Sequence, residues 1–171
     1  MFEKGEFVIY ETAGVCQVMD VTTIKMDGAQ KDRLYYILRP VKESGSSIYC
    51  PVDNTKVHIR RIMNRQEAED LLNEIPDAEE LWIPNEKMRE DKYREAIRSC
   101  DAHRYVQIIK TLYLRRIERM AEKKKITSTD EKYLRVAEDA LYAELSIPLQ
   151  IPKERMSDYI ADRLEKAKQE L

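Results

Sequence analysis

The hydrophobic positions of the first 60 residues fall in short runs that are rich in β-branched and aromatic side chains. Turn signals around Gly28 and Gly45 separate these runs, as is typical of strands joined by tight turns. Four or five short antiparallel strands in so few residues predict a small SH3-like or Tudor-like barrel. The expected strands are 7–10, 15–24, 34–38, 48–50 and 57–59.

After residue 63 glycine disappears and the hydrophobic period becomes that of helices. Asn64 and Glu67 have the spacing of a helix cap, and a capping box is expected at 128–131. Pro148 is expected to end that helix, and Pro152 to begin the last one. The expected helices are 64–73, 85–100, 101–124, 133–145 and 152–170.

Two apolar stripes are expected along these helices. Val106, Ile109, Tyr113, Ile117 and Met120 recur every three or four residues, and a second stripe runs along 134–145. The fold class is therefore α+β, with an antiparallel β-barrel domain at 1–63 followed by an all-α domain of about five helices at 64–171.

Charge is unevenly distributed along the chain, although the net charge is only −2. Residues 65–84 carry 1 Lys/Arg against 7 Asp/Glu, whereas residues 85–125 carry 13 against 7. A basic segment in a mildly acidic protein is a local surface that a polyanion could recognise.

Residues that could perform catalysis are scarce. The three cysteines and two histidines are far apart, and no nucleotide-binding, hydrolase or metalloprotease motif occurs. We therefore expect reduced and mostly buried thiols, no metal, no cofactor and no enzyme activity. The chain has no apolar run long enough for a membrane span and no secretory leader at its start, so a cytoplasmic protein is expected.

The single tryptophan, Trp82, lies between the acidic and the basic segments. It could pack in the core, or it could be an exposed wedge, because proteins that distort the minor groove insert apolar side chains and hold phosphates with Lys and Arg. Cations at 87, 94 and 98 fall opposite apolar positions 93, 97 and 100, and three arginines at 104, 115 and 119 share a polar face. Such faces are either solvated or bind phosphate.

The order of these segments resembles that of CarD-type bacterial transcription regulators. The matching segments in the first half are 7–10, 14–15, 35–38 and 48–54, and those in the second half are Trp82, 89–101, 112–116 and 143–145. The barrel is also similar to one in transcription-repair coupling factors. The resemblance spans about residues 2–165.

This resemblance implies a regulator that binds the RNA polymerase β-subunit through its barrel and contacts promoter DNA at the upstream edge of the transcription bubble. In such proteins a tryptophan wedges into the minor groove and open complexes persist. The implied DNA-binding residues are Trp82, Lys87, Arg89, Lys92, Arg98 and Lys132. The implied polymerase-binding residues are Ile24, Lys25 and Met26, in the strand before the hairpin, and Tyr49.

Two alternatives stay open at this point. The first is a polymerase-binding adaptor whose helical domain engages another protein, with Trp82 packed in its core. The second is a stand-alone nucleic-acid-binding protein that uses the basic segment and binds duplex DNA tightly without polymerase. In each case a monomer that does not contact membranes is expected.

Overall fold

The structure is a computed structural model that describes residues 1–170. It divides into two compact units, the first formed by Met1–Ile62 and the second beginning at Met63. Each unit is described by itself below.

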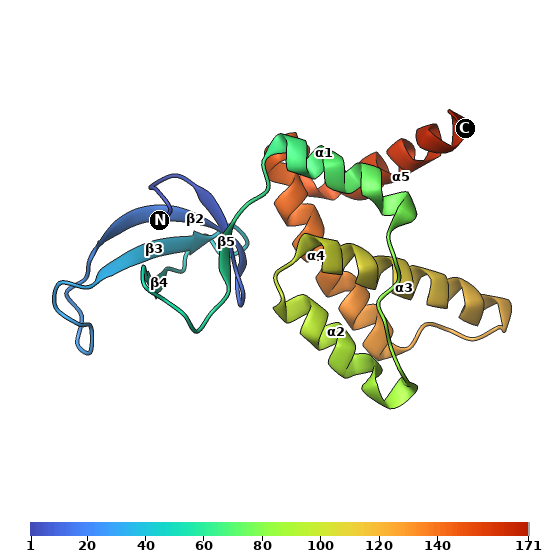
Figure 1. The fold of residues 1–171 in the computed structure, drawn as a ribbon, viewed down its shortest axis with the longest axis horizontal. Helices are drawn as coiled ribbons and strands as arrows, with labels where there is room; N and C mark the ends of the chain where they lie inside the picture. The colour runs from blue at the N-terminus through green and yellow to red at the C-terminus, as the bar shows by residue number, and fades with distance from the viewer. Residues whose placement is uncertain (171) are drawn as a thin grey trace. The chain divides into compact units, whose positions relative to one another are not determined.

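The first unit is a five-stranded antiparallel sheet with the order β4-β3-β2-β1-β5 (Figure 1). Because β4 and β5 are the two ends of this order, the sheet is open, and its barrel-like curvature is compatible with a Tudor fold. The expected α+β class is therefore confirmed. The strands are β1 (Phe7–Tyr10), β2 (Gly14–Thr23), β3 (Leu34–Pro40), β4 (Ile48–Pro51) and β5 (Ile59–Arg61).

One face of the sheet forms the core of this unit. Val8, Val18 and Leu38 are almost fully buried, and two thiols, Cys16 and Cys50, pack with them. Burial does not alternate strictly along the strands, because Val8 and Ile9 in β1 are both buried, as are Tyr35 and Tyr36 in β3. All three cysteines of the chain are buried and free, as expected.

The last strand begins two residues later than expected. The Asn54 side chain forms hydrogen bonds with both backbone polar groups of Val57. Its Oδ1 accepts from the Val57 N–H at 3.3 Å, and its Nδ2 donates to the Val57 carbonyl at 2.7 Å. The backbone N–H of His58 donates to the Glu11 carboxylate at 3.0 Å. Pairing with β1 therefore starts only at Ile59, which lies opposite Tyr10.

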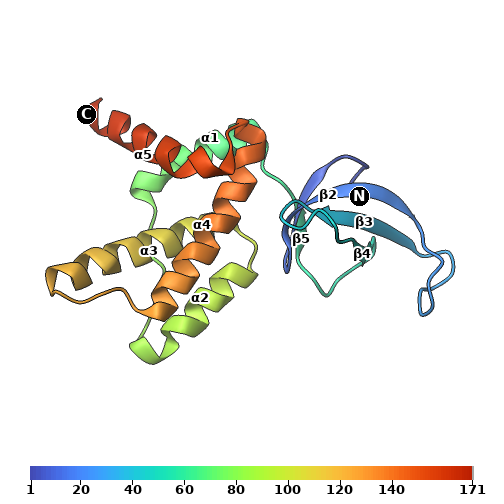
Figure 2. The same cartoon turned by 180° about the vertical axis from the view of Figure 1, so that it is seen from behind.

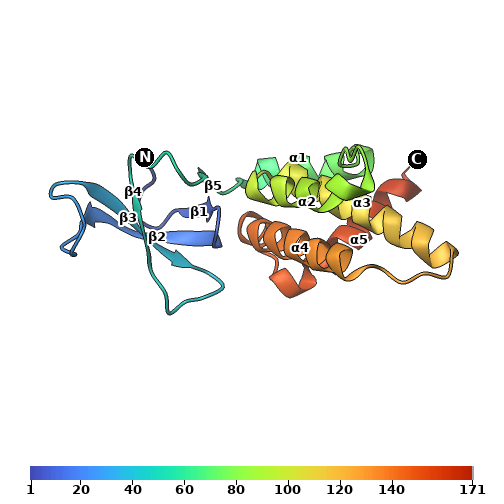
Figure 3. The same ribbon diagram turned by 90° about the horizontal axis from the view of Figure 1, so that it is seen from below.

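Residues 63–170 of the second unit form five α-helices, the number that the sequence predicts, and two short 3₁₀ turns. Helices α3 and α4 lie side by side with α2 against both, while α1 and α5 pack at the other end of α4 (Figure 2). Viewed from below, α2 and α4 form two layers (Figure 3). The elements are α1 (Arg65–Glu74), η1 (Ile75–Asp77), η2 (Glu86–Met88), α2 (Arg89–Arg98), α3 (Ala102–Ala121), α4 (Ser128–Leu149) and α5 (Lys153–Gln169).

Two buried clusters hold these helices together. One joins α1, α3, α4 and α5 around Leu72, Leu145 and Met156. The other joins α2, α3 and α4 around Tyr93 and Leu112. The predicted stripe along 134–145 is buried. In the part of the chain that the structure describes, no helix is long and apolar enough to cross a membrane.

Helix boundaries follow the sequence at α1 and differ at α4. Asn64 and Glu67 form the expected capping box. The capping box expected at 128–131 is wrong, because Thr127 is the N-cap and its hydroxyl accepts from the Asp130 N–H at 3.1 Å. Helix α4 also continues through Pro148 to Leu149.

Pro148 does not end α4 because it lies in the last turn, where its missing N–H removes a single bond. The helix instead stops at Gln150, which has the left-handed conformation. The Ile151 N–H donates back to the Ser146 carbonyl at 3.2 Å, which closes the helix end. Burial of Leu149, which is 4% exposed, favours the extra turn.

The apolar stripe of α3 is buried over only part of its length. Val106 is 5% exposed, whereas Tyr113, Ile117 and Met120 are 58%, 51% and 62% exposed. The shared apolar face is therefore exposed in the C-terminal half of α3. The cluster formed with α1, α4 and α5 includes Val106 and Ile109 from this face, so only the first half of the helix is covered there.

Candidate functional site

Trp82 lies on the surface of the helical unit. Its exposed fraction is 73%, the highest after Met1 among the large hydrophobic residues that the structure describes. The neighbouring residue Leu81 is 7% exposed and packs in the cluster around Tyr93. The segment between η1 and η2 therefore has one side chain anchored in the core and the next one directed to solvent. The interpretation of Trp82 as a core residue is wrong.

The Trp82 segment, residues 78–85, crosses α3 and is attached to it by two side chains (Figure 1). The Leu81 N–H donates to the Thr111 hydroxyl oxygen at 2.8 Å, in a buried position. That hydroxyl in turn donates to the Gln107 carbonyl at 2.7 Å. Three residues earlier in the segment, the Ala78 carbonyl accepts a hydrogen bond from the Lys110 ammonium. The backbone next to Trp82 is thus held in a defined position.

Lys92 of α2 is the cation placed beside the tryptophan. Its Nζ lies 5.5 Å from the centroid of the Trp82 ring, within the range of a cation–π contact. The same ammonium lies 3.3 Å from the Glu95 carboxylate. Lys92 and Trp82 therefore form one composite surface, although they are ten residues apart in the sequence.

The other cations that the resemblance implies are less closely grouped. Lys87 is exposed in the turn η2, and Arg98 is exposed at the far end of α2, about 9 Å along the helix axis from Lys92. The Lys132 ammonium lies over the ring of Tyr133, 5.3 Å from its centroid. Arg89 is only 18% exposed, because it belongs to a network of charged groups below the surface.

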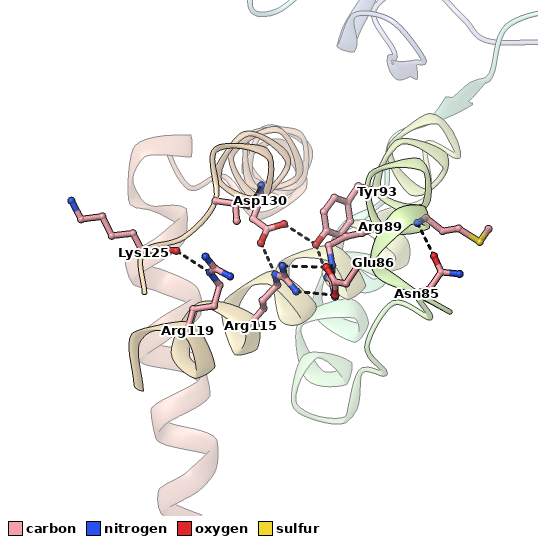
Figure 4. Close-up of polar contacts among 10 residues, drawn as sticks. Asn85, Glu86, Arg89, Tyr93, Arg115, Arg119, Lys125 and Asp130 are labelled. Atoms are coloured by element: carbon pink, nitrogen blue, oxygen red, sulfur yellow. Dashed lines mark hydrogen bonds and ion pairs between the residues drawn. The ribbon is translucent and has the colours of Figure 1, made fainter. Parts of the chain in front are cut away.

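This network centres on Asp130, which is 1% exposed (Figure 4). Its Oδ2 accepts from the Arg115 Nε at 2.7 Å, and its Oδ1 accepts from the Tyr93 hydroxyl at 3.0 Å. Tyr93 accepts in turn from Arg89 at 2.8 Å. A buried carboxylate with two strong donors satisfies the requirement that buried charges be paired. The network joins α2, α3 and the first turn of α4.

Glu86 closes the network at the surface. Its carboxylate accepts from Arg89, with Nη2 at 2.9 Å and Nε at 3.1 Å, and from Arg115, with Nη1 at 3.2 Å. The side chain of Glu86 is nevertheless 68% exposed. One solvent-exposed carboxylate thus bridges two arginines that are themselves mostly covered.

The ionisation of these groups follows from their contacts. Hydrogen bonds from Arg89, and then the charges of both arginines, lower the pKa of Glu86. Burial raises the pKa of Tyr93 to about 12. For Arg89, burial opposes the charged form, but hydrogen bonds to Glu86 and Tyr93 outweigh it and the pKa is raised. At neutral pH the two arginines and Glu86 are therefore charged, and the Tyr93 phenol is neutral.

The arginines expected to share a polar face turn out to have internal partners. Arg115 pairs with Asp130, Arg119 donates to the Lys125 carbonyl at 2.8 Å, and Arg104 lies 4.0 Å from Glu95. Sequence reasoning missed the roles of Asp130, Glu86 and Thr111, because each depends on contact between separate helices. No group of three potential metal ligands occurs within residues 1–170.

The residues expected to bind polymerase lie at two places in the sheet unit. The expectation that Ile24, Lys25 and Met26 lie in a strand is wrong, because pairing of β2 with β3 ends at Thr23. Tyr49 lies on the edge strand β4 and is 43% exposed. The register aligns Tyr49 with Ile37 and hence with Asp20, so the end of β2 at Thr23 is about 10 Å farther along the strand, and Ile24 follows it. The structure does not bring these two sets together.

Comparison with known families adds the assignment of the sheet unit. A family model described as the CarD-like/TRCF RID domain matches residues 2–63, which are nearly the residues of the first compact unit. No curated protein matches the chain. RNA polymerase is the partner that this domain indicates. The chain is therefore a transcription-related protein in which residues 2–63 form a CarD-like, RNA-polymerase-interacting domain.

Proposed function

We propose that the protein binds the β-subunit of bacterial RNA polymerase through its sheet unit and stabilises promoter open complexes through its helical unit. In this proposal Trp82 inserts into the minor groove at the upstream edge of the bubble, and nearby cations hold the phosphates. The protein acts as a monomer in the bacterial cytoplasm and catalyses no reaction.

The observation that carries this proposal is the exposure of Trp82 on an anchored segment. An indole that is 73% exposed forgoes the favourable free energy that burial of its apolar surface would give, and this surface is available to a binding partner. The Leu81–Thr111 hydrogen bond fixes the backbone beside it. A fixed apolar side chain next to a cation such as Lys92 has the features of a minor-groove wedge.

Attachment to polymerase explains how the overall charge is compatible with DNA contact. The net charge is −2, and two exposed carboxylates, Glu79 and Glu80, immediately precede the tryptophan segment's buried anchor. Affinity for free duplex DNA should therefore be weak, since neutralisation of phosphates supplies most non-specific binding. Tethering to polymerase raises the local DNA concentration and makes a weak contact sufficient.

On the polymerase side, the edge strand β4 offers a route of recognition that depends little on side-chain identity. An edge strand can pair with a strand of its partner through backbone groups. Tyr49 on β4, and Ile24, Lys25 and Met26 beyond the end of β2, would then contribute side-chain contacts on either side of the pairing.

The decisive experiment measures the lifetime of promoter open complexes formed by bacterial RNA polymerase with the wild-type protein, with Trp82→Ala and without addition. We expect the wild type to lengthen the lifetime of the open complex. With Trp82→Ala the lifetime should be about tenfold shorter than with the wild type, which corresponds to about 1.4 kcal/mol. The variant should remain folded and polymerase-bound, because Trp82 is outside the core. Equal lifetimes with wild type and Trp82→Ala would contradict the wedge.

A second candidate function, contact of the helical unit with another protein, is favoured by the exposed half of the α3 stripe. Tyr113, Ile117 and Met120 form an apolar surface that a protein partner could cover. Tyr113→Ala distinguishes the two candidates in the same assay. If Tyr113→Ala shortens the lifetime and Trp82→Ala does not, the protein-contact function replaces the DNA-contact function.

A further inference from the structure

Two guanidinium groups converge on a single exposed carboxylate next to the Trp82 segment (Figure 4). Arg89 from α2 and Arg115 from α3 both donate to Glu86 Oε1, at 2.9 and 3.2 Å. Their second donors reach Oε2 at 3.1 and 3.4 Å. Two planar forks that share one anion form the geometry with which arginines bind phosphate.

The two arginines are also held from beneath, independently of Glu86. Arg115 Nε donates to the buried Asp130 at 2.7 Å, and Arg89 Nη1 donates to the Tyr93 hydroxyl, which bonds to the same Asp130. The side chains of Arg89 and Arg115 are 18% and 22% exposed. Because Asp130 and Tyr93 fix both side chains, their outer N–H groups would keep their positions if Glu86 moved away.

Glu86, by contrast, is the most accessible member of the cluster. Its side chain is 68% exposed, and it lies in the three-residue turn η2. The backbone of this turn is closed by the Met88 N–H, which donates to Asn85, and by the Arg89 N–H, which donates to the Glu86 carbonyl. Without Glu86 the two arginines are balanced only by Asp130, which leaves one net positive charge at the surface. The arrangement is a preformed anion site that an exposed side chain fills.

We propose that Arg89 and Arg115 form a binding site for a phosphate group of the DNA backbone, and that Glu86 occupies this site in the free protein. A phosphate displaces the Glu86 carboxylate when DNA is delivered to the helical unit. The inference rests on the proposed function for its choice of DNA, because Glu86 is only four residues from Trp82. Glu86 thereby keeps the affinity for free DNA low.

The test compares Glu86→Gln with Glu80→Gln in binding of the full chain to a short DNA duplex, without polymerase, over a series of salt concentrations. Glu80 is exposed two residues before Trp82, so its variant removes the same charge nearby without opening the site. We expect Glu86→Gln to bind about three- to tenfold more tightly than Glu80→Gln. The slope of log K against log salt should steepen by about 0.9, the value for one additional phosphate.

A second variant tests whether the guanidinium group of Arg89 binds the phosphate. In Glu86→Gln/Arg89→Lys the positive charge remains but the planar pair of donors is lost. We expect this double variant to return to the affinity of Glu80→Gln. Arg89 is at the first position of α2 and partly exposed, and circular dichroism should confirm that the double variant retains its helix content.

The outcomes separate the site from the function on which it rests. Equal affinities and slopes for Glu86→Gln and Glu80→Gln would overturn the site, since only general charge would then matter. Tighter binding of inorganic phosphate by Glu86→Gln, without tighter binding of duplex, would overturn DNA as the ligand. A failed open-complex assay together with the expected Glu86→Gln slope would reject the proposed promoter function and leave the phosphate site standing.

Discussion

Thr111 is the residue that attaches the Trp82 segment to the core. Its hydroxyl accepts from the Leu81 N–H and donates to the Gln107 carbonyl, so a single buried oxygen satisfies two backbone groups. Thr111 and Arg115 are four residues apart and therefore share one face of α3. That face carries the Trp82 segment at Thr111 and the Glu86 turn at Arg115, which are the two ends of the candidate site.

We predict that Thr111→Val lowers the free energy of unfolding by about 1–3 kcal/mol, because the buried Leu81 N–H loses its acceptor while the side-chain shape is kept. Urea unfolding measures the loss, and hydrogen exchange should show faster exchange of the Leu81 amide. Thr111→Ser is the matched control, since it keeps the hydroxyl. If the Leu81 amide exchanges equally fast in Thr111→Ser and in Thr111→Val, the hydroxyl does not hold the segment.

At the scale of elements, helix α4 shows how a local signal can be displaced by one residue. The expected cap is Ser128, and the structure uses the neighbouring residue Thr127. This choice places Asp130 in the first turn, where it faces Arg115 and Tyr93. The cap and the buried network therefore specify the same start of α4.

We predict that Thr127→Ala costs about 1 kcal/mol of stability through loss of the N-cap, whereas Ser128→Ala is nearly neutral. The measurement is the urea midpoint followed by circular dichroism. A larger loss in Ser128→Ala than in Thr127→Ala would show that Ser128 is the cap in solution.

The periodicity of the sequence was sufficient to predict the strands, the five helices and the buried stripe along 134–145, because each follows from local pattern. It could not show that Tyr113, Ile117 and Met120 are exposed, since an apolar stripe has the same spacing whether or not another helix covers it. The Asp130 network was equally out of reach, because it requires three helices to meet. Trp82 was recognised as a candidate, but its exposure is a property of the packed unit.

At the scale of the whole molecule, the two units have separate cores, and each contains an acid whose neutral form folding favours. Burial raises the pKa of Cys16, in the sheet unit, from 9.0 to about 11. Burial likewise raises the pKa of Tyr93, in the helical unit, from 10.0 to about 12. The neutral thiol and phenol stabilise the folded state fully below the unfolded pKa, and this stability is lost as pH rises through the folded value.

We therefore predict that both units lose stability between about pH 9 and pH 12. Ionisation of Cys16 should cause the loss in the sheet unit, and ionisation of Tyr93 the loss in the helical unit. Hydrogen exchange at rising pH, corrected for the intrinsic rate, should show Cys16→Ala slowing the loss of protection in residues 1–62 alone. Tyr93→Phe should act in the same way on the helical unit, after allowance for its lost hydrogen bonds. An effect of Cys16→Ala on protection of the helical unit would contradict separate cores.

The position of the only tryptophan also gives the molecule an optical property. Tyrosines are spread over both units, but selective excitation of indole addresses Trp82 alone. Its emission in the free protein should have the long wavelength of a water-exposed ring, and stacking against bases should quench it. The natural chain therefore carries, without any added label, a fluorescent reporter at the one surface where contact with DNA is proposed.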